Sequence, residues 1–195
     1  MKRTISAVIT AAALSLPFTA IADHHKGLKD IDSLVDVAVT VNGPESPFEG
    51  AFDTLITLLT ENVPGRSDIL TTLDSRGQYT VFAPTDTAFE NLEKTVLTLG
   101  YCSVADLDPE VVNAVLLYHV AKGRRYAADV LDSTQVNMLA GGFLQHDSAI
   151  LTDNLNRTSN LIPGALDVEA DNGVIHGIDT VVLPVLPDPG PGGCA

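Results

Sequence analysis

The chain has 195 residues and a formal net charge of −14, with 25 Asp and Glu residues against 11 Lys and Arg residues. Hydrophobic residues make up 45% of it, which is enough for one domain with its own core. So acidic a protein repels nucleic acids and anionic lipids, and its composition therefore excludes both as partners.

The first 22 residues have the features of an export signal. A basic start at Lys2 and Arg3 precedes an apolar run over residues 5–16, which is too short to span a bilayer. The sequence Ala-Ile-Ala at 20–22 has the small-residue pattern that signal peptidase recognises. We predict cleavage after Ala22, which gives a secreted or periplasmic protein with no later membrane span.

The first half of the remaining chain has the apolar spacing of helices. A helix is predicted around residues 31–39, with Asp30 or Asp32 as its cap. Others are predicted at residues 52–59, 67–77, 85–100 and 108–120. Thr85 and Asp108 are good caps for the last two, and a proline follows Asp108 at the first helical position.

Strands are predicted mainly in the second half. The sequence YTVFAP at 79–84 is rich in β-branched and aromatic residues and ends in proline, as strands often do. Beyond Gly123, short strands are predicted at residues 135–138, 142–145, 148–152, 165–170 and 173–184. Helices followed by strands indicate a single α+β domain, with helices packed on an antiparallel sheet or a sandwich.

The chain has two cysteines, Cys102 and Cys194. In an oxidising compartment an even pair is expected to be bridged. The bridge would hold the Pro- and Gly-rich tail, residues 188–195, against the domain. A free thiol on a frayed tail and a link between two molecules are the alternatives.

Three stretches of sequence, in order, resemble the signature blocks of the fasciclin domain family. They are YTVFAPTDTAF (79–89), LLYHVAKGR (116–124) and NGVIHGIDTVVLP (172–184). The resemblance covers residues 28–187, almost all of the chain after the signal. It implies a wedge-shaped β-sandwich flanked by helices and a non-enzymatic extracellular role in adhesion or matrix interaction.

We therefore expect an exported interaction module without a catalytic site or cofactor. Its partner would be an extracellular protein, a surface polysaccharide or a second copy of the chain. The alternative is a periplasmic carrier that holds a small ligand between the helices and the sandwich. In the family, the Tyr-His block has been linked to integrin binding. The residues of the matched blocks that are interaction candidates are Thr85, Asp86, Tyr118, His119 and His176.

His119 and His176 invite three interpretations: two metal ligands, a catalytic pair, or two core residues. A zinc site needs three or four protein ligands, but the only other histidine in the middle of the chain is His146. The sequence has no HExxH motif, no paired-cysteine spacing and no GxSxG motif. A Ser-His-Asp set is spatial and stays open. We predict that both histidines stabilise the fold.

Cleavage after Ala22 would expose Asp23, His24 and His25 as a new N-terminus. A free amine, two backbone amides and an imidazole at the third position can form a square-planar site for Cu(II) or Ni(II). The alternative is a frayed polar end that captures metal adventitiously.

Overall fold

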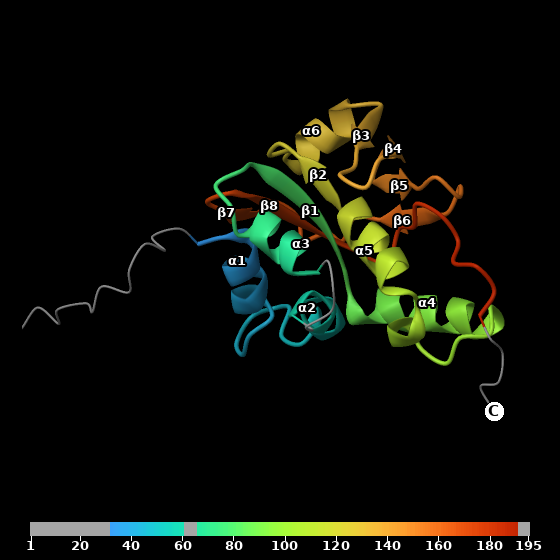
Figure 1. Ribbon diagram of the computed structural model, residues 1–195. Coiled ribbons are helices and arrows are strands. Elements are labelled where there is room, and N and C mark those ends of the chain that lie inside the picture. The colour runs from blue at the N-terminus through green and yellow to red at the C-terminus, as the bar shows by residue number, and fades with distance from the viewer. Residues whose placement is uncertain (1–31, 61–65, 191–195) are drawn as a thin grey trace, which may run out of the picture.

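Two four-stranded sheets lie at the centre of the protein in this computed structural model, which describes residues 32–60 and 66–190 (Figure 1). Helices cover one side of the first sheet, and the second sheet lies on its other side. In chain order the elements are α1 (Leu34–Val41), α2 (Asp53–Thr60), α3 (Arg66–Leu73), β1 (Tyr79–Pro84), α4 (Asp86–Thr98), a 3-10 turn (Val104–Asp106), α5 (Pro109–Tyr118), β2 (Val120–Lys122), α6 (Ala127–Asp132), β3 (Gln135–Asn137), β4 (Phe143–Asp147), β5 (Ile150–Thr152), β6 (Thr158–Asn160), β7 (Val168–Ala170) and β8 (Gly173–Ile178).

The first sheet is mixed, where the sequence had suggested an antiparallel one. Its order is β2-β1-β8-β7, and β1 and β8 run parallel, with Val81 opposite Ile175 and Phe82 opposite His176. The backbones approach closely, because a Cβ on Gly173 would overlap the carbonyl oxygen of Tyr79. The second sheet, β3-β4-β5-β6, is antiparallel throughout.

Side chains of β1 alternate between two hydrophobic cores. Val81 and Ala83 belong to the core under the helices, which we call the helix-side core. Phe82 points the other way, into the core between the two sheets, which we call the sandwich core. Because β8 lies between β1 and β7 and both of its faces are covered, all six of its residues are buried.

Helix starts follow local capping, with one difference from the prediction. Thr85 and Asp108 cap α4 and α5 as expected. The cap of α1 is Ser33 instead of Asp30 or Asp32, because Ser33 and Asp36 form a reciprocal capping box.

The last predicted strand, expected to reach Pro184, ends at Ile178. The carboxylate of Asp179 accepts bonds from the backbone and side-chain amides of Asn160, which turns the chain away from the sheet. Residues 181–183 then run as an extended segment between the two cores. Val181 and Leu183 pack in the helix-side core and Val182 in the sandwich core.

Candidate functional site

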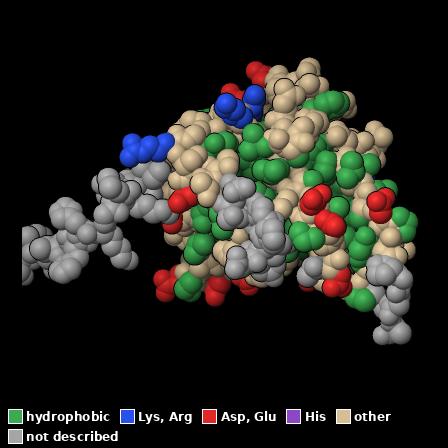
Figure 2. Space-filling model, in the orientation of Figure 1, with side chains coloured by type: hydrophobic (Ala, Val, Ile, Leu, Met, Phe, Trp, Pro, Cys, Tyr) green, Lys and Arg blue, Asp and Glu red, His purple; other side chains and the backbone are tan. Residues whose placement is uncertain are grey.

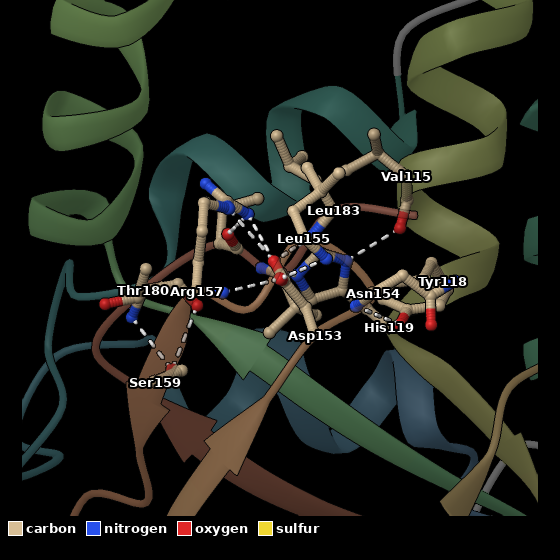
Figure 3. Close-up of polar contacts among 12 residues, drawn as sticks. Val115, Tyr118, His119, Asp153, Asn154, Leu155, Arg157, Ser159, Thr180 and Leu183 are labelled. Atoms are coloured by element: carbon tan, nitrogen blue, oxygen red, sulfur yellow. Dashed lines mark hydrogen bonds and ion pairs between the residues drawn. The ribbon is translucent and has the colours of Figure 1, made fainter. Parts of the chain in front are cut away.

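His119 ends α5 and is buried under the 181–183 segment (Figure 3). Its Nδ1–H donates to the carbonyl oxygen of Val115 at 2.7 Å, and its Nε2 accepts the N–H of Val182 at 3.2 Å. Burial lowers the pKa of His119 from 6.5 to about 4, although the bond to Val115 opposes the shift. The ring is therefore neutral at pH 7, and both of its nitrogens are bonded to backbone.

Asp153 and Arg157 form an ion pair beside His119 (Figure 3), with 2.7 Å between Nη2 and Oδ2. The Asp153 carboxylate also accepts the N–H of Leu183 at 3.0 Å, and Arg157 donates to the carbonyl oxygen of Val181 at 2.7 Å. Three consecutive residues, 181 to 183, are thus each held by one polar side chain: Arg157, His119 and Asp153. Neither residue was predicted from the sequence, because the bonds to residues 181–183 join positions that are far apart in the chain.

Tyr118 ties α5 to the second sheet. Its ring is fully buried, and its hydroxyl donates to the carbonyl oxygen of Phe143 at 2.7 Å and accepts the N–H of Asn154 at 3.2 Å. Burial raises the pKa of Tyr118. The Tyr-His block therefore faces the interior of the domain and joins α5 to β4 and to the 181–183 segment.

His176 is fully buried in β8 and has the opposite tautomer to His119. Its Nε2–H donates to the carbonyl oxygen of Arg125 at 2.8 Å, and its Nδ1 accepts the N–H of Asp167 at 3.2 Å. Burial lowers the pKa of His176, against the effect of the bond to Arg125. His176 thus fixes the loop between β2 and α6.

Thr85 and Asp86 lie at the start of α4. The Thr85 hydroxyl accepts the N–H of Ala88 at 3.4 Å as the helix cap, and an Asp86 carboxylate oxygen accepts the N–H of Thr54 at 2.8 Å. These bonds fasten α2 to the start of α4. The five candidates predicted from sequence therefore lie at three places in the fold and each bonds to backbone.

The described residues assemble neither a Ser-His-Asp triad nor a metal site. Ser133 Oγ lies 3.5 Å from His146 Nε2, but His146 Nδ1 has no hydrogen-bond partner there, so the carboxylate of a Ser-His-Asp set is missing. Within residues 32–60 and 66–190, no three His, Cys, Asp or Glu side chains are grouped to hold a metal ion. The proposed Asp23–His25 site lies outside these ranges.

The tail approaches the loop that carries Cys102, since the N–H of Gly190 donates to the carbonyl oxygen of Leu99 at 2.7 Å. Cys194 lies outside the described residues, so its pairing with Cys102 stays a prediction.

Hollows of two kinds are present. Two apolar cavities of about 20 and 40 Å³ lie in the helix-side core, on either side of Leu55. A shallow polar concavity of about 570 Å³ lies at the surface between β2 and α6, lined by Gly123, Arg124, Arg125, Asp129, Asp132 and Ser133.

Comparison with known proteins agrees with this fold. The uncharacterized protein sll1735 of Synechocystis is 33% identical over 151 residues, covering 77% of this chain and 97% of that protein. The transforming growth factor-beta-induced protein ig-h3 of Sus scrofa is 31% identical over 168 residues, covering 84% of this chain but only 22% of that protein. A FAS1 domain pair from the insect cell adhesion molecule Fasciclin I matches with a TM-score of 0.57 and 17% identity, covering 77% of this chain and 50% of that one. The family model for the fasciclin domain matches residues 50–184, and the chain belongs to the fasciclin domain family.

Proposed function

We propose that this protein is an exported interaction module that binds an extracellular protein or a surface polysaccharide. Family membership carries the proposal: a fasciclin domain pair occurs in an insect cell adhesion molecule, and most of this chain aligns with ig-h3. Its action is binding, without catalysis. No helix in the described part of the chain is both long and apolar enough to cross a membrane.

The matched sequence blocks serve this function indirectly. Tyr118, His119 and His176 are buried, so a partner would meet the loops that these side chains hold in place. A rigid frame of this kind presents surface loops with little loss of conformational entropy on binding. Tyr118, His119 and the Thr85-Asp86 cap thus contribute to interaction by positioning other residues.

The carrier alternative has weaker support. Pockets for small ligands usually hold roughly 300–1,000 Å³. The two apolar cavities between the helices and the first sheet hold about 20 and 40 Å³, which is room for a few water-sized groups. A carrier would need the helices to move apart.

A binding assay on the host's own surface tests the function. The protein is isolated from the host's periplasm and medium, its N-terminus is sequenced, and it is incubated with washed cell envelopes. We expect a chain starting at Asp23 that binds saturably and is recovered with the envelopes. If the protein is not retained on the envelopes, and native mass spectrometry shows extra mass that survives dialysis, the carrier function would be supported in place of the interaction function.

A further inference from the structure

Positive charge is concentrated at one place on this acidic protein. Of the seven Lys and Arg residues in the described ranges, three lie within residues 122–125, between β2 and α6. Figure 2 shows one group of Lys and Arg side chains at the upper end of the molecule, near α6, and a second at its left edge, while most Asp and Glu side chains on this face lie lower. The seven are Arg66, Arg76, Lys94, Lys122, Arg124, Arg125 and Arg157.

Arg124 is committed to the fold. Its Nε donates to the side-chain oxygen of Gln78 at 3.0 Å, and its Nη2 donates to the carbonyl oxygens of Ala170 and Asp171 at 2.7 and 2.9 Å. Its guanidinium therefore joins the turn after β2 to the turn between β7 and β8.

Arg125 has a fixed backbone and a side chain with no partner. Its N–H donates to Thr80 Oγ1 at 2.9 Å, and its carbonyl oxygen accepts from His176 Nε2 at 2.8 Å. No hydrogen bond or ion pair joins its side chain to any described residue, although its Nε is buried. Its two Nη atoms are not buried, and they can donate two bonds to a carboxylate that approaches from the surface.

The side chains that line the concavity beside Arg125 limit which anions can bind there. Its lining holds two carboxylates, Asp129 and Asp132, and no apolar side chain. The carboxylates repel a ligand with several negative charges, but they accept hydrogen bonds from hydroxyl groups.

We propose that Arg125, Asp129 and Asp132 bind a uronic acid unit of an extracellular polysaccharide. The guanidinium of Arg125 receives the uronate carboxylate, and the two aspartates accept bonds from the sugar hydroxyls. At about 570 Å³ the concavity has room for one or two sugar rings. This inference rests on the proposed interaction function and identifies its ligand class.

An NMR titration of the full exported protein tests this site. Methyl glucuronide is added while the Nε–Hε signal of Arg125 is followed, with methyl glucoside as the uncharged probe. We expect a saturable shift with the glucuronide. The glucoside should bind with an affinity at least about tenfold lower. The absence of any shift at Arg125 would overturn the site.

Variants separate the contributions of charge and of hydroxyl binding. Arg125→Gln should weaken glucuronide binding by about tenfold at an unchanged melting temperature, because that side chain has no bonds in the fold. The matched control is Arg76→Gln, since Arg76 is exposed and lies outside the concavity. Asp132→Asn should weaken glucuronide binding but strengthen acetate binding.

Other outcomes count against the inference. Equal losses of glucuronide affinity in the Arg76 and Arg125 variants would show that binding depends on the overall charge of the protein and not on this site. Tighter binding of an acetylated peptide through its C-terminal carboxylate would show that the ligand class is wrong. Envelope binding that persists fully in Arg125→Gln would overturn this site while leaving the interaction function intact.

Discussion

The two faces of the first sheet are packed differently. On the sandwich side, Phe82, Leu144 and Leu151 have no exposed surface. On the helix side, Leu55 and Leu58 each keep 6% of their surface, and both apolar cavities lie among such residues. The helix-side core thus leaves gaps between short helices, and neither of these cavities reaches the residues of the sandwich core.

Polar anchoring is present on both faces of the first sheet. The buried hydroxyl of Tyr118 and the ring of His176 bond to backbone around the sandwich core. The larger helix-side cavity is lined almost entirely by apolar side chains. Hydrogen bonds are directional and fix one arrangement, while apolar contacts tolerate several. Beside this cavity, however, the side chain of Asn172 accepts the N–H of Leu34 at 2.8 Å and donates to the carbonyl oxygen of Leu73 at 2.6 Å, so α1 and α3 are anchored as well. The room to adjust therefore lies in the cavities themselves.

Leucine truncation on the two faces should show the largest difference. Leu144→Ala in the sandwich core is expected to lower the free energy of unfolding by about 5 kcal/mol, because its surroundings cannot collapse into the gap. Leu58→Ala, beside a cavity, should cost about 3 kcal/mol. Urea denaturation measures both values. Equal costs, or the reverse order, would contradict the difference in packing.

Breaking the ion pair should weaken both cores, since the 181–183 segment contributes to each. Asp153→Asn removes the charge partner of Arg157, and we expect a loss toward the lower end of ~3–5 kcal/mol, as Arg157 is partly exposed. Asp147→Asn, at an exposed position, is the control and should change little. A loss below about 1 kcal/mol would show that the segment is held by packing alone.

Acid should destabilise the fold through His119. Its pKa is about 4 in the folded protein and 6.5 without burial, so between these values the unfolded chain binds more protons. The contribution of neutral His119 to the free energy of unfolding is therefore fully present above pH 6.5. It falls by up to about 3 kcal/mol as the pH drops to 4. Denaturation curves of wild type and His119→Gln at pH 7 and 4.5 test this: the variant should lose less stability than wild type on acidification.

Adding a methylene group should give the smallest effects, and with opposite signs. Val35→Ile extends a side chain into the 40 Å³ cavity and should add up to about 0.8 kcal/mol of stability. Val136→Ile in the sandwich core should remove about 1–3 kcal/mol through overpacking. Melting temperatures report both changes. A stabilised Val136 variant would show that the sandwich core also contains unfilled space.

The sequence predicted the elements whose signals are local. β1 occupies the predicted residues 79–84, and α4 and α5 begin directly after Thr85 and Asp108, because caps and proline act over one helical turn. Among the described residues, β2, α6 and β6 were missed. They have six residues or fewer, so their sequences carry little periodicity, and tertiary contacts define them.

The candidate residues show the same limit. Sequence blocks located Tyr118, His119 and His176, and the structure shows what each one holds. Asp153 and Arg157 had no such signal, because their role depends on contacts with residues 181–183. The unpartnered side chain of Arg125 is likewise visible only in three dimensions.

The parallel pairing of β1 with β8 has a consequence for how the chain folds. Residues 79–81 also pair with β2, but the full length of β1 is paired only when residues 173–178 are present, and Ile175 and Ile178 complete one core each. Contacts between residues so distant in the chain form slowly. While a chain is still being synthesised, neither core can close until β8 has emerged from the ribosome. Such a chain stays unfolded until late in synthesis, which is what the proposed export across a membrane would require.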